Sequence, residues 1–190
     1  MPLFIWITGF VLFVSLAFFA FAQAAVARNG AQSAADAAAL AAAQDARGEL
    51  TEELLLSVQE GDEDWSDWLS IDRMVGETAE EAAGRLAAAN DAQVTAFRGA
   101  EVGGKGGYAV EVRSVDPVGD SVLPMTSGTY ANAEATAVVE PLCEPDSEGD
   151  PSERISFSCD DGTIVDVDAE DFDMSDLPTP STLFSVYLAN

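Results

Sequence analysis

Residues 28–47 read RNGAQSAADAAALAAAQDAR, and this alanine-rich stretch decides how the chain is built. Alanine has the highest helix propensity of the common residues, so the stretch predicts a helix with one weak position at Gly30. Small residues recur at every fourth position, which lines them up on one side and lets a neighbouring helix approach closely. These predicted stem-packing residues are Gly30, Ala31, Ala34, Ala35, Ala38, Ala39 and Ala42.

A lone alanine-rich helix would gain little from burial, because its side chains offer little apolar surface. We therefore expect this face to pack against helices of other subunits, and the alternative is a passive spacer. Arg28, Asp36 and Asp45 would then lie on the wetter side of the helix or pair with neighbouring subunits.

An apolar run, LFIWITGFVLFVSLAFFAFA, occupies residues 3–22 directly before this stretch. A helix of that length crosses about 30 Å of hydrocarbon. The run therefore predicts one membrane-spanning helix that continues into the alanine-rich stretch, with a buried core helix as the lesser alternative.

A cleaved signal peptide is the main alternative for this segment. Signal peptides carry a basic region and a shorter apolar core of about 7–15 residues, and neither feature is present here. However, AFA at residues 20–22 and AVA at residues 25–27 are acceptable cleavage sites. Cleavage would release a secreted acidic binding or adhesion module.

The rest of the chain is strongly acidic. The sequence contains 34 Asp and Glu against 8 Lys and Arg, a formal net charge of -26, and residues 1–27 carry no charged side chain. Such a surface repels phosphate backbones, so we do not expect nucleic acid as a partner. We divide the chain into a stem, residues 1–46, and an acidic extracytoplasmic head domain, residues 47–190.

The only two cysteines, Cys143 and Cys159, predict a disulfide, and the alternative is two free buried thiols. There is no CxxC motif and no histidine, so the spacing does not indicate a zinc site or a redox motif. A disulfide closing this loop would contribute about 3 kcal/mol in the chain-entropy model. Because such bonds persist outside the reducing cytosol, the pair favours an extracytoplasmic head. Arg28, taken alone, would favour the opposite orientation.

Short helices are predicted at the start of the head. Residues 49–61 form one, and Trp65 and Trp68 lie three residues apart on another turn, where they would seal a small core or dock a partner. Residues 78–91 form a further helix, with a capping box at Thr78 and with Leu86 and alanines facing inward.

Alternating apolar and polar residues predict strands over residues 93–102, 108–115 and 131–140. GGKGG at residues 103–107 lacks the GxxxxGK[ST] order, so it predicts a hairpin connection and not a phosphate loop. Residues 154–168 predict two more strands. The expected fold is α+β, with one small antiparallel sheet and one disulfide.

Acidic residues near the end of the chain suggest calcium, but the EF-hand order is missing and a solvated face is favoured. They are Asp160, Asp161, Asp166, Asp168, Glu170, Asp171 and Asp173. We expect no metal and no cofactor. Without histidine or a nucleophile motif such as G-x-S-x-G, we also expect that the protein is not an enzyme.

Three segments resemble the TadE/TadG-like (TadG-related) proteins of bacterial tight-adherence (Flp) pilus systems: residues 3–47, ATAVVEPLC at 135–143 and LFSVYLAN at 183–190. The resemblance implies a pseudopilin-like or accessory membrane component that acts in pilus assembly or surface adhesion. It implies a single-pass protein of the bacterial cell membrane or of the surface pilus. Expected partners are other pilus-system membrane proteins, pilin-like subunits or a second copy of the chain.

One feature of prepilin-like members of that family is missing. They carry a basic leader, a glycine at the cleavage point and a glutamate five residues into the mature helix. Here Gly9 is the only candidate glycine, and Val14 stands at the fifth position after it. This favours an unprocessed accessory protein over a polymerised subunit.

Overall fold

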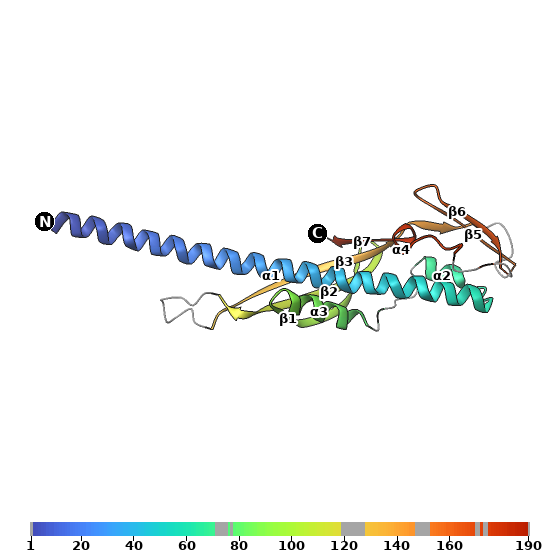
Figure 1. Ribbon diagram of the computed structural model, residues 1–190, viewed down its shortest axis with the longest axis horizontal. Helices are drawn as coiled ribbons and strands as arrows, with labels where there is room; N and C mark the ends of the chain where they lie inside the picture. The colour runs from blue at the N-terminus through green and yellow to red at the C-terminus, as the bar shows by residue number, and fades with distance from the viewer. Residues whose placement is uncertain are drawn as a thin grey trace.

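The computed structural model describes residues 2–70, 76, 78–118, 128–146, 153–169, 172 and 175–189. One long helix runs the length of an elongated molecule, and the head is assembled along the second half of that helix (Figure 1). The fold is α+β, as predicted. Its elements are α1 (Pro2–Glu60), α2 (Trp65–Leu69), α3 (Ala79–Ala89), β1 (Ala92–Val102), β2 (Lys105–Pro117), β3 (Tyr130–Pro141), β4 (Cys143–Pro145), β5 (Arg154–Cys159), β6 (Ile164–Asp168), α4 (Pro180–Leu183) and β7 (Phe184–Ala189).

Helix α1 passes without a break from the stem into the head. Residues 49–61, predicted as a separate helix, are its last turns, because an exposed Gly48 does not interrupt it. A glycine inside a helix costs only about 1 kcal/mol, which the packing of α1 offsets. The helix ends at Gly61, whose φ of 69° suits glycine. The division expected after residue 46 therefore lies inside α1 and does not coincide with a break in structure.

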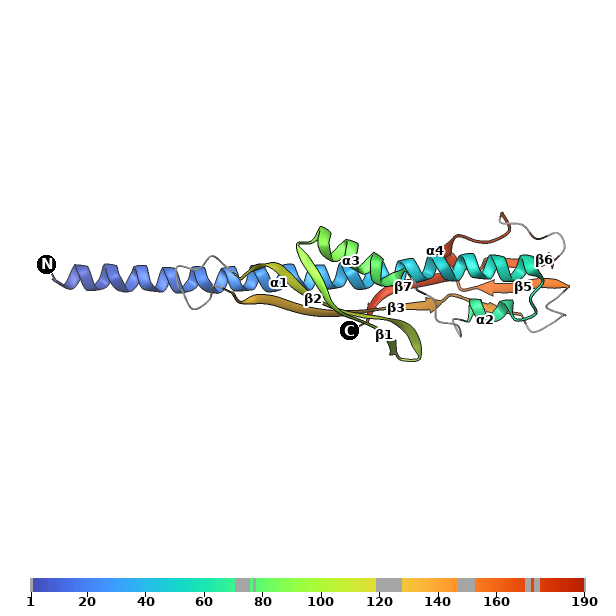
Figure 2. The ribbon, with the colours of Figure 1, turned by 90° about the horizontal axis from the view of Figure 1, so that it is seen from below.

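A four-stranded antiparallel sheet forms the body of the head, in the order β1-β2-β3-β7. The strands β1 and β2 form the predicted hairpin, whose turn uses Gly103 and Gly104 with φ of 62° and 81°. Helix α1 packs on β2, β3 and β7, and α3 packs against α1 and β1 (Figure 2). Alternate residues of the sheet, including Val110, Val112 and Ala137, are buried in one core with α1.

A second sheet, in the order β4-β5-β6, lies at the end of the molecule away from the N-terminus (Figure 1). The sequence predicted one sheet, but Leu142 separates β3 from β4, and a second sheet forms in which β5 pairs with β4 and β6 pairs with β5. Cys143 and Cys159 face each other across β4 and β5 and form the predicted disulfide. The Trp65 ring lies 6.3 Å from that of Phe157 and is buried, so it belongs to the core.

The start of α3 differs from the prediction. Thr78 makes no side-chain capping bond. Its Oγ1 lies 2.6 Å from Asp45 Oδ2 and 2.9 Å from Glu49 Oε1, so α1 takes the hydroxyl that would have capped α3. Leu86 was expected to face inward, but it is 38% exposed. The inward face of α3 consists of alanines, which lets it lie close to α1; they are Ala79, Ala82, Ala83 and Ala87.

Candidate functional site on the stem helix

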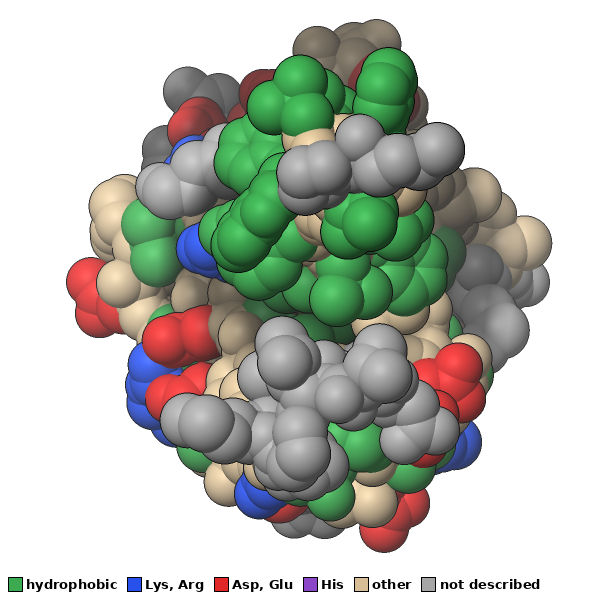
Figure 3. All heavy atoms as spheres, turned by 90° about the vertical axis from the view of Figure 1, so that its left-hand side faces the viewer, with side chains coloured by type: hydrophobic (Ala, Val, Ile, Leu, Met, Phe, Trp, Pro, Cys, Tyr) green, Lys and Arg blue, Asp and Glu red, His purple; other side chains and the backbone are tan. Residues whose placement is uncertain are grey.

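The first half of α1 carries large apolar side chains that nothing in the described structure covers. Trp6 is 79% exposed and Phe21 is 78% exposed. Viewed from the N-terminal end, the projecting part of α1 presents its own apolar side chains at the surface (Figure 3). An 18-residue window of this segment has a mean hydropathy of 2.4, and none of it is buried. A helix that is apolar all round and uncovered needs an apolar surrounding, and α1 is long and apolar enough to cross a membrane.

The stem surface is notched at Gly9. The missing side chain leaves a hollow on the helix, bordered by Ile5, Trp6, Phe10 and Phe13. Small residues of this kind let the backbones of membrane helices approach each other. The polar Ser15 does not disturb the segment, because its Oγ donates to the Val11 carbonyl at 2.9 Å.

The predicted stem-packing residues divide at the point where the head begins. Gly30 is exposed, and a Cβ atom added to it would meet nothing within 4 Å. The other six are all buried: Ala31, Ala34, Ala35, Ala38, Ala39 and Ala42. The sequence predicted that helices of other subunits cover this face, whereas in the structure β3 and α3 of the same chain lie against α1. The stem surface left open to other helices is therefore residues 3–30.

Periodicity indicated which face of the helix is small but not what covers it. The covering strand also presents small residues, with Ala135 and Ala137 of β3 both buried in the same core. Alanine opposite alanine allows a helix and a sheet to pack closely along many turns. Alternating alanines in residues 131–137 were the signal in the sequence that could have identified this partner.

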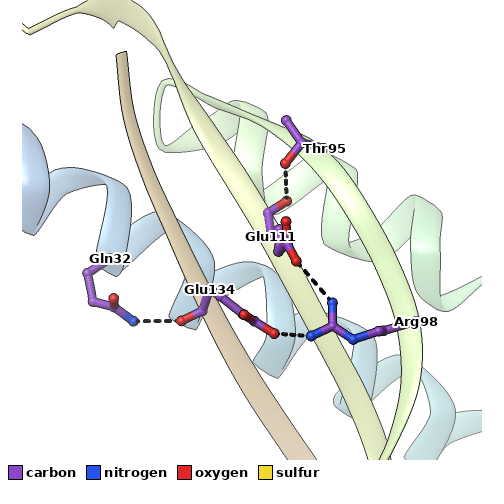
Figure 4. A network of polar contacts seen from close by, with 5 residues as sticks. All are labelled: Gln32, Thr95, Arg98, Glu111 and Glu134. Carbon is purple, nitrogen blue, oxygen red and sulfur yellow. Dashed lines mark hydrogen bonds and ion pairs between the residues drawn. The ribbon is translucent and has the colours of Figure 1, made fainter. Parts of the chain in front are cut away.

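A line of polar contacts connects α1 to the sheet at the edge of this buried face (Figure 4). Gln32 Nε2 donates to Asp36 Oδ1 at 2.8 Å and to the Glu134 carbonyl at 3.3 Å. The Glu134 carboxylate accepts from Arg98, which also donates to Glu111 at 3.2 Å.

These ion pairs connect three neighbouring strands, β1, β2 and β3, on the exposed side of the sheet. The hydrogen bond that Arg98 donates to the Glu134 carboxylate is the main cause that raises the pKa of Arg98. The Arg98 side chain is 50% exposed, and ion pairs in such exposed positions contribute little to stability.

A second polar contact fixes α3 beside α1. The Thr78 hydroxyl meets the carboxylates of Asp45 and Glu49, as described above, and Tyr108 of β2 lies near them. Burial, and then the negative charges of Glu49 and Asp45, raise the pKa of the Tyr108 phenol. Gly76 has a φ of 132°, and an added Cβ atom would overlap the Tyr108 hydroxyl, so only glycine fits there.

The described residues contain no group of three or more ligands that could hold a metal ion. Arg154 binds both Asp166 and Asp168, and this contact lowers the pKa of Asp166. Asp161 accepts the Thr163 N–H at 2.9 Å, which lowers its pKa as well. The calcium hypothesis also named Glu170, Asp171 and Asp173, which lie outside the described residues.

The comparisons with known proteins concern the stem. No curated protein and no solved structure matches the chain. A family model described as putative Flp pilus-assembly TadE/G-like matches residues 1–45. The match covers the exposed half of α1 and the first buried turns, and its description names assembly and no catalytic activity. It confirms the resemblance predicted from the sequence: the segment that forms the stem is similar to the TadE/G-like proteins of Flp pilus assembly.

Proposed function

We propose that this protein is a single-pass, pseudopilin-like or accessory membrane component of a tight-adherence (Flp) pilus, and that it acts in pilus assembly or surface adhesion without catalysis. One observation carries the proposal: the uncovered apolar run of residues 3–22 belongs to the same continuous helix on which the head is built. A helix of this kind connects events inside the membrane to the head without a hinge.

The stem acts by packing against other membrane helices of the pilus system. Between lipid-exposed helices, close packing and not the hydrophobic effect drives association. The notch at Gly9 gives the stem a position where a side chain of a neighbouring helix fits. Gly30, which stays exposed where α1 enters the head, is the one predicted packing residue that remains open to such a neighbour.

The head lies on the extracytoplasmic side. The Cys143–Cys159 disulfide supports this location, because such bonds do not persist in a reducing cytosol. Residues 23–30 separate the apolar run from the first buried residue, Ala31, and extend about 12 Å as helix. The acidic head is thereby held clear of the hydrocarbon and stays hydrated.

A stem exchange tests this function. In cells that lack the protein, we expect fewer sheared pili, and we expect the native chain to restore them. A variant in which residues 3–22 are replaced by an unrelated leucine–alanine membrane helix of equal length keeps the anchor and loses the specific surface. We expect this variant to reach the membrane but to restore few pili. If this variant restores pili as fully as the native chain does, the stem is a passive anchor and the proposed packing is wrong.

A secreted module is the second candidate, and the structure gives one reason to retain it. Cleavage after AVA at residues 25–27 would remove the apolar run and leave the whole buried part of α1, which begins at Ala31. The head would then act alone, as an acidic binding or adhesion module. A soluble mature protein that begins at Gln23 or Arg28 would establish this candidate in place of the first.

A further inference from the structure

The central sheet is incomplete along one edge. Strand β7 pairs with β3 only from Thr136 to Pro141, and its last described residue, Ala189, faces Thr136. Strand β3 begins at Tyr130, so its first residues extend beyond the end of β7, towards the N-terminal end of the molecule (Figure 1). Among the described strands, none pairs with this first part of β3 on the β7 side.

The backbone groups of this first part point to the open edge at alternate residues. In an antiparallel strand, the N–H and the carbonyl of one residue point to the same side, and this side alternates from one residue to the next. The Glu134 carbonyl accepts from Gln32 of α1, and the Ala131 N–H donates to Ser114 Oγ on the β2 side. Even-numbered residues of β3 therefore present their N–H and carbonyl groups outward, which includes Asn132 and Glu134.

A hollow of about 530 Å³ lies beside this edge. Its lining comes from α1, from β3 and from the end of β7: Gln32, Asp36, Glu134, Ala135, Thr136, Leu188 and Ala189. An extended segment entering here would have α1 on one side and the β3 edge as its hydrogen-bonding partner. Gln32 would give up the Glu134 carbonyl to that segment and keep its shorter bond to Asp36.

The charge of the hollow identifies the kind of segment that fits. Asp36 accepts a hydrogen bond from the neutral Gln32, and it takes part in none of the ion pairs formed among the described residues. The chain as a whole has a net charge of -26. A second copy would oppose acidic residues to acidic residues, which disfavours it. A basic segment would neutralise Asp36.

We propose that β3 accepts a strand from another protein at Asn132–Glu134, in line with β7, and that this strand is an extended segment with a lysine or arginine side chain against Asp36. Main-chain hydrogen bonds to the sheet edge supply affinity in such complexes, and the side-chain contact supplies specificity. The proposal does not depend on the pilus function, because it rests on the sheet edge and the hollow alone.

Binding of a synthetic strand to the full chain in detergent tests the proposal. The probe is a peptide of about eight residues that alternates valine and lysine, and the control peptide has glutamate in place of lysine. We expect the basic peptide to bind with a Kd of about 100 µM or tighter and the acidic one at least roughly tenfold more weakly. Failure of the basic peptide to bind would overturn the proposal.

Two further measurements distinguish strand addition from general attraction to an acidic protein. N-methylation of the peptide at one alternate set of residues should abolish binding, while methylation of the other set should leave it, because only one edge of an added strand faces β3. Asp36→Lys should weaken binding about tenfold, whereas Glu80→Lys, an equal charge change at an exposed position of α3, should leave it nearly unchanged. Equal effects of both methylated sets, or of both substitutions, would contradict the proposal.

Discussion

The two halves of α1 share one helical backbone but differ in the size and the exposure of their side chains. Residues 3–30 present large apolar side chains, among them Trp6 and Phe21, to the outside. Residues 31–60 bury small alanines and a few leucines under the head. The exposed half shows that its surroundings must themselves be apolar, whereas the buried half shows how closely a sheet and a helix can approach. One unbroken helix therefore serves two environments, and Gly30 and Ala31 mark the change between them.

The largest expected effect comes from removing a large side chain from the buried half. Leu54 is 1% exposed and Leu12 is 65% exposed. We expect Leu54→Ala to lower the free energy of unfolding of the head by about 2–5 kcal/mol, because it leaves a cavity in the core. Leu12→Ala should change it by less than about 0.5 kcal/mol. Thermal unfolding in detergent measures both, and equal losses would contradict a division of α1 into two halves.

A charge in the exposed half should act on the membrane and not on the head. We expect Val14→Lys to make insertion of the stem less favourable by about 3 kcal/mol, the cost of lysine near the centre of a membrane helix. Ile164 of β6, which is 71% exposed, provides the matched change in the head. Ile164→Lys should leave insertion unchanged. Insertion into membrane vesicles measures both variants, and indifference to Val14→Lys would argue against a spanning stem.

Enlarging a small side chain in each half of α1 is the reverse of the leucine-to-alanine test. We expect Ala38→Leu to destabilise the head by about 1–3 kcal/mol, because Ala38 is fully buried and the sheet cannot move away freely. Ala25→Leu makes the same change at an exposed position and should not affect the stability of the head. If Ala38→Leu instead leaves the melting temperature unchanged and weakens recovery of partner subunits, this face packs against other chains.

The smallest expected effect concerns the ion pairs of the head. Arg154 lowers the pKa of Asp166 in the folded state, so the contribution of the pair is present above the unfolded pKa of about 3.9 and is lost as the pH falls through the lower folded pKa. Arg154→Gln should therefore lower the melting temperature slightly at pH 7, and the difference should vanish under strongly acidic conditions. A difference that persists there, or that survives high salt at pH 7, would indicate lost packing instead of lost charge.

Local patterns in the sequence predicted much of this molecule. The structure contains the predicted apolar helix, the strands and the hairpin at Gly103, because each of them depends on residues close together in the sequence. It also contains the predicted disulfide, because two cysteines can pair with each other in one way only. Thr78 shows where a local rule failed, because its hydroxyl bonds to α1 instead of capping α3.

The long-range arrangement could not be predicted in the same way. The alanine face of α1 has the spacing of a helix–helix contact, and the same spacing suits a sheet of small residues. In the structure the sheet and the helix α3 of the same chain both lie against α1, and this arrangement depends on pairings between segments far apart in the sequence. The open edge of β3 depends on where β7 ends relative to Thr136, which is a property of the pairing and not of either segment alone.

The intact mass of the native, unreduced protein, taken from membrane and culture-fluid fractions, tests the central claim most directly. We predict a membrane-bound chain that retains residues 3–22 and is lighter than its reduced form by the two thiol hydrogens of Cys143 and Cys159. A soluble chain that begins at Gln23 or Arg28 would contradict the account, because the exposed half of α1 would then be absent from the mature protein.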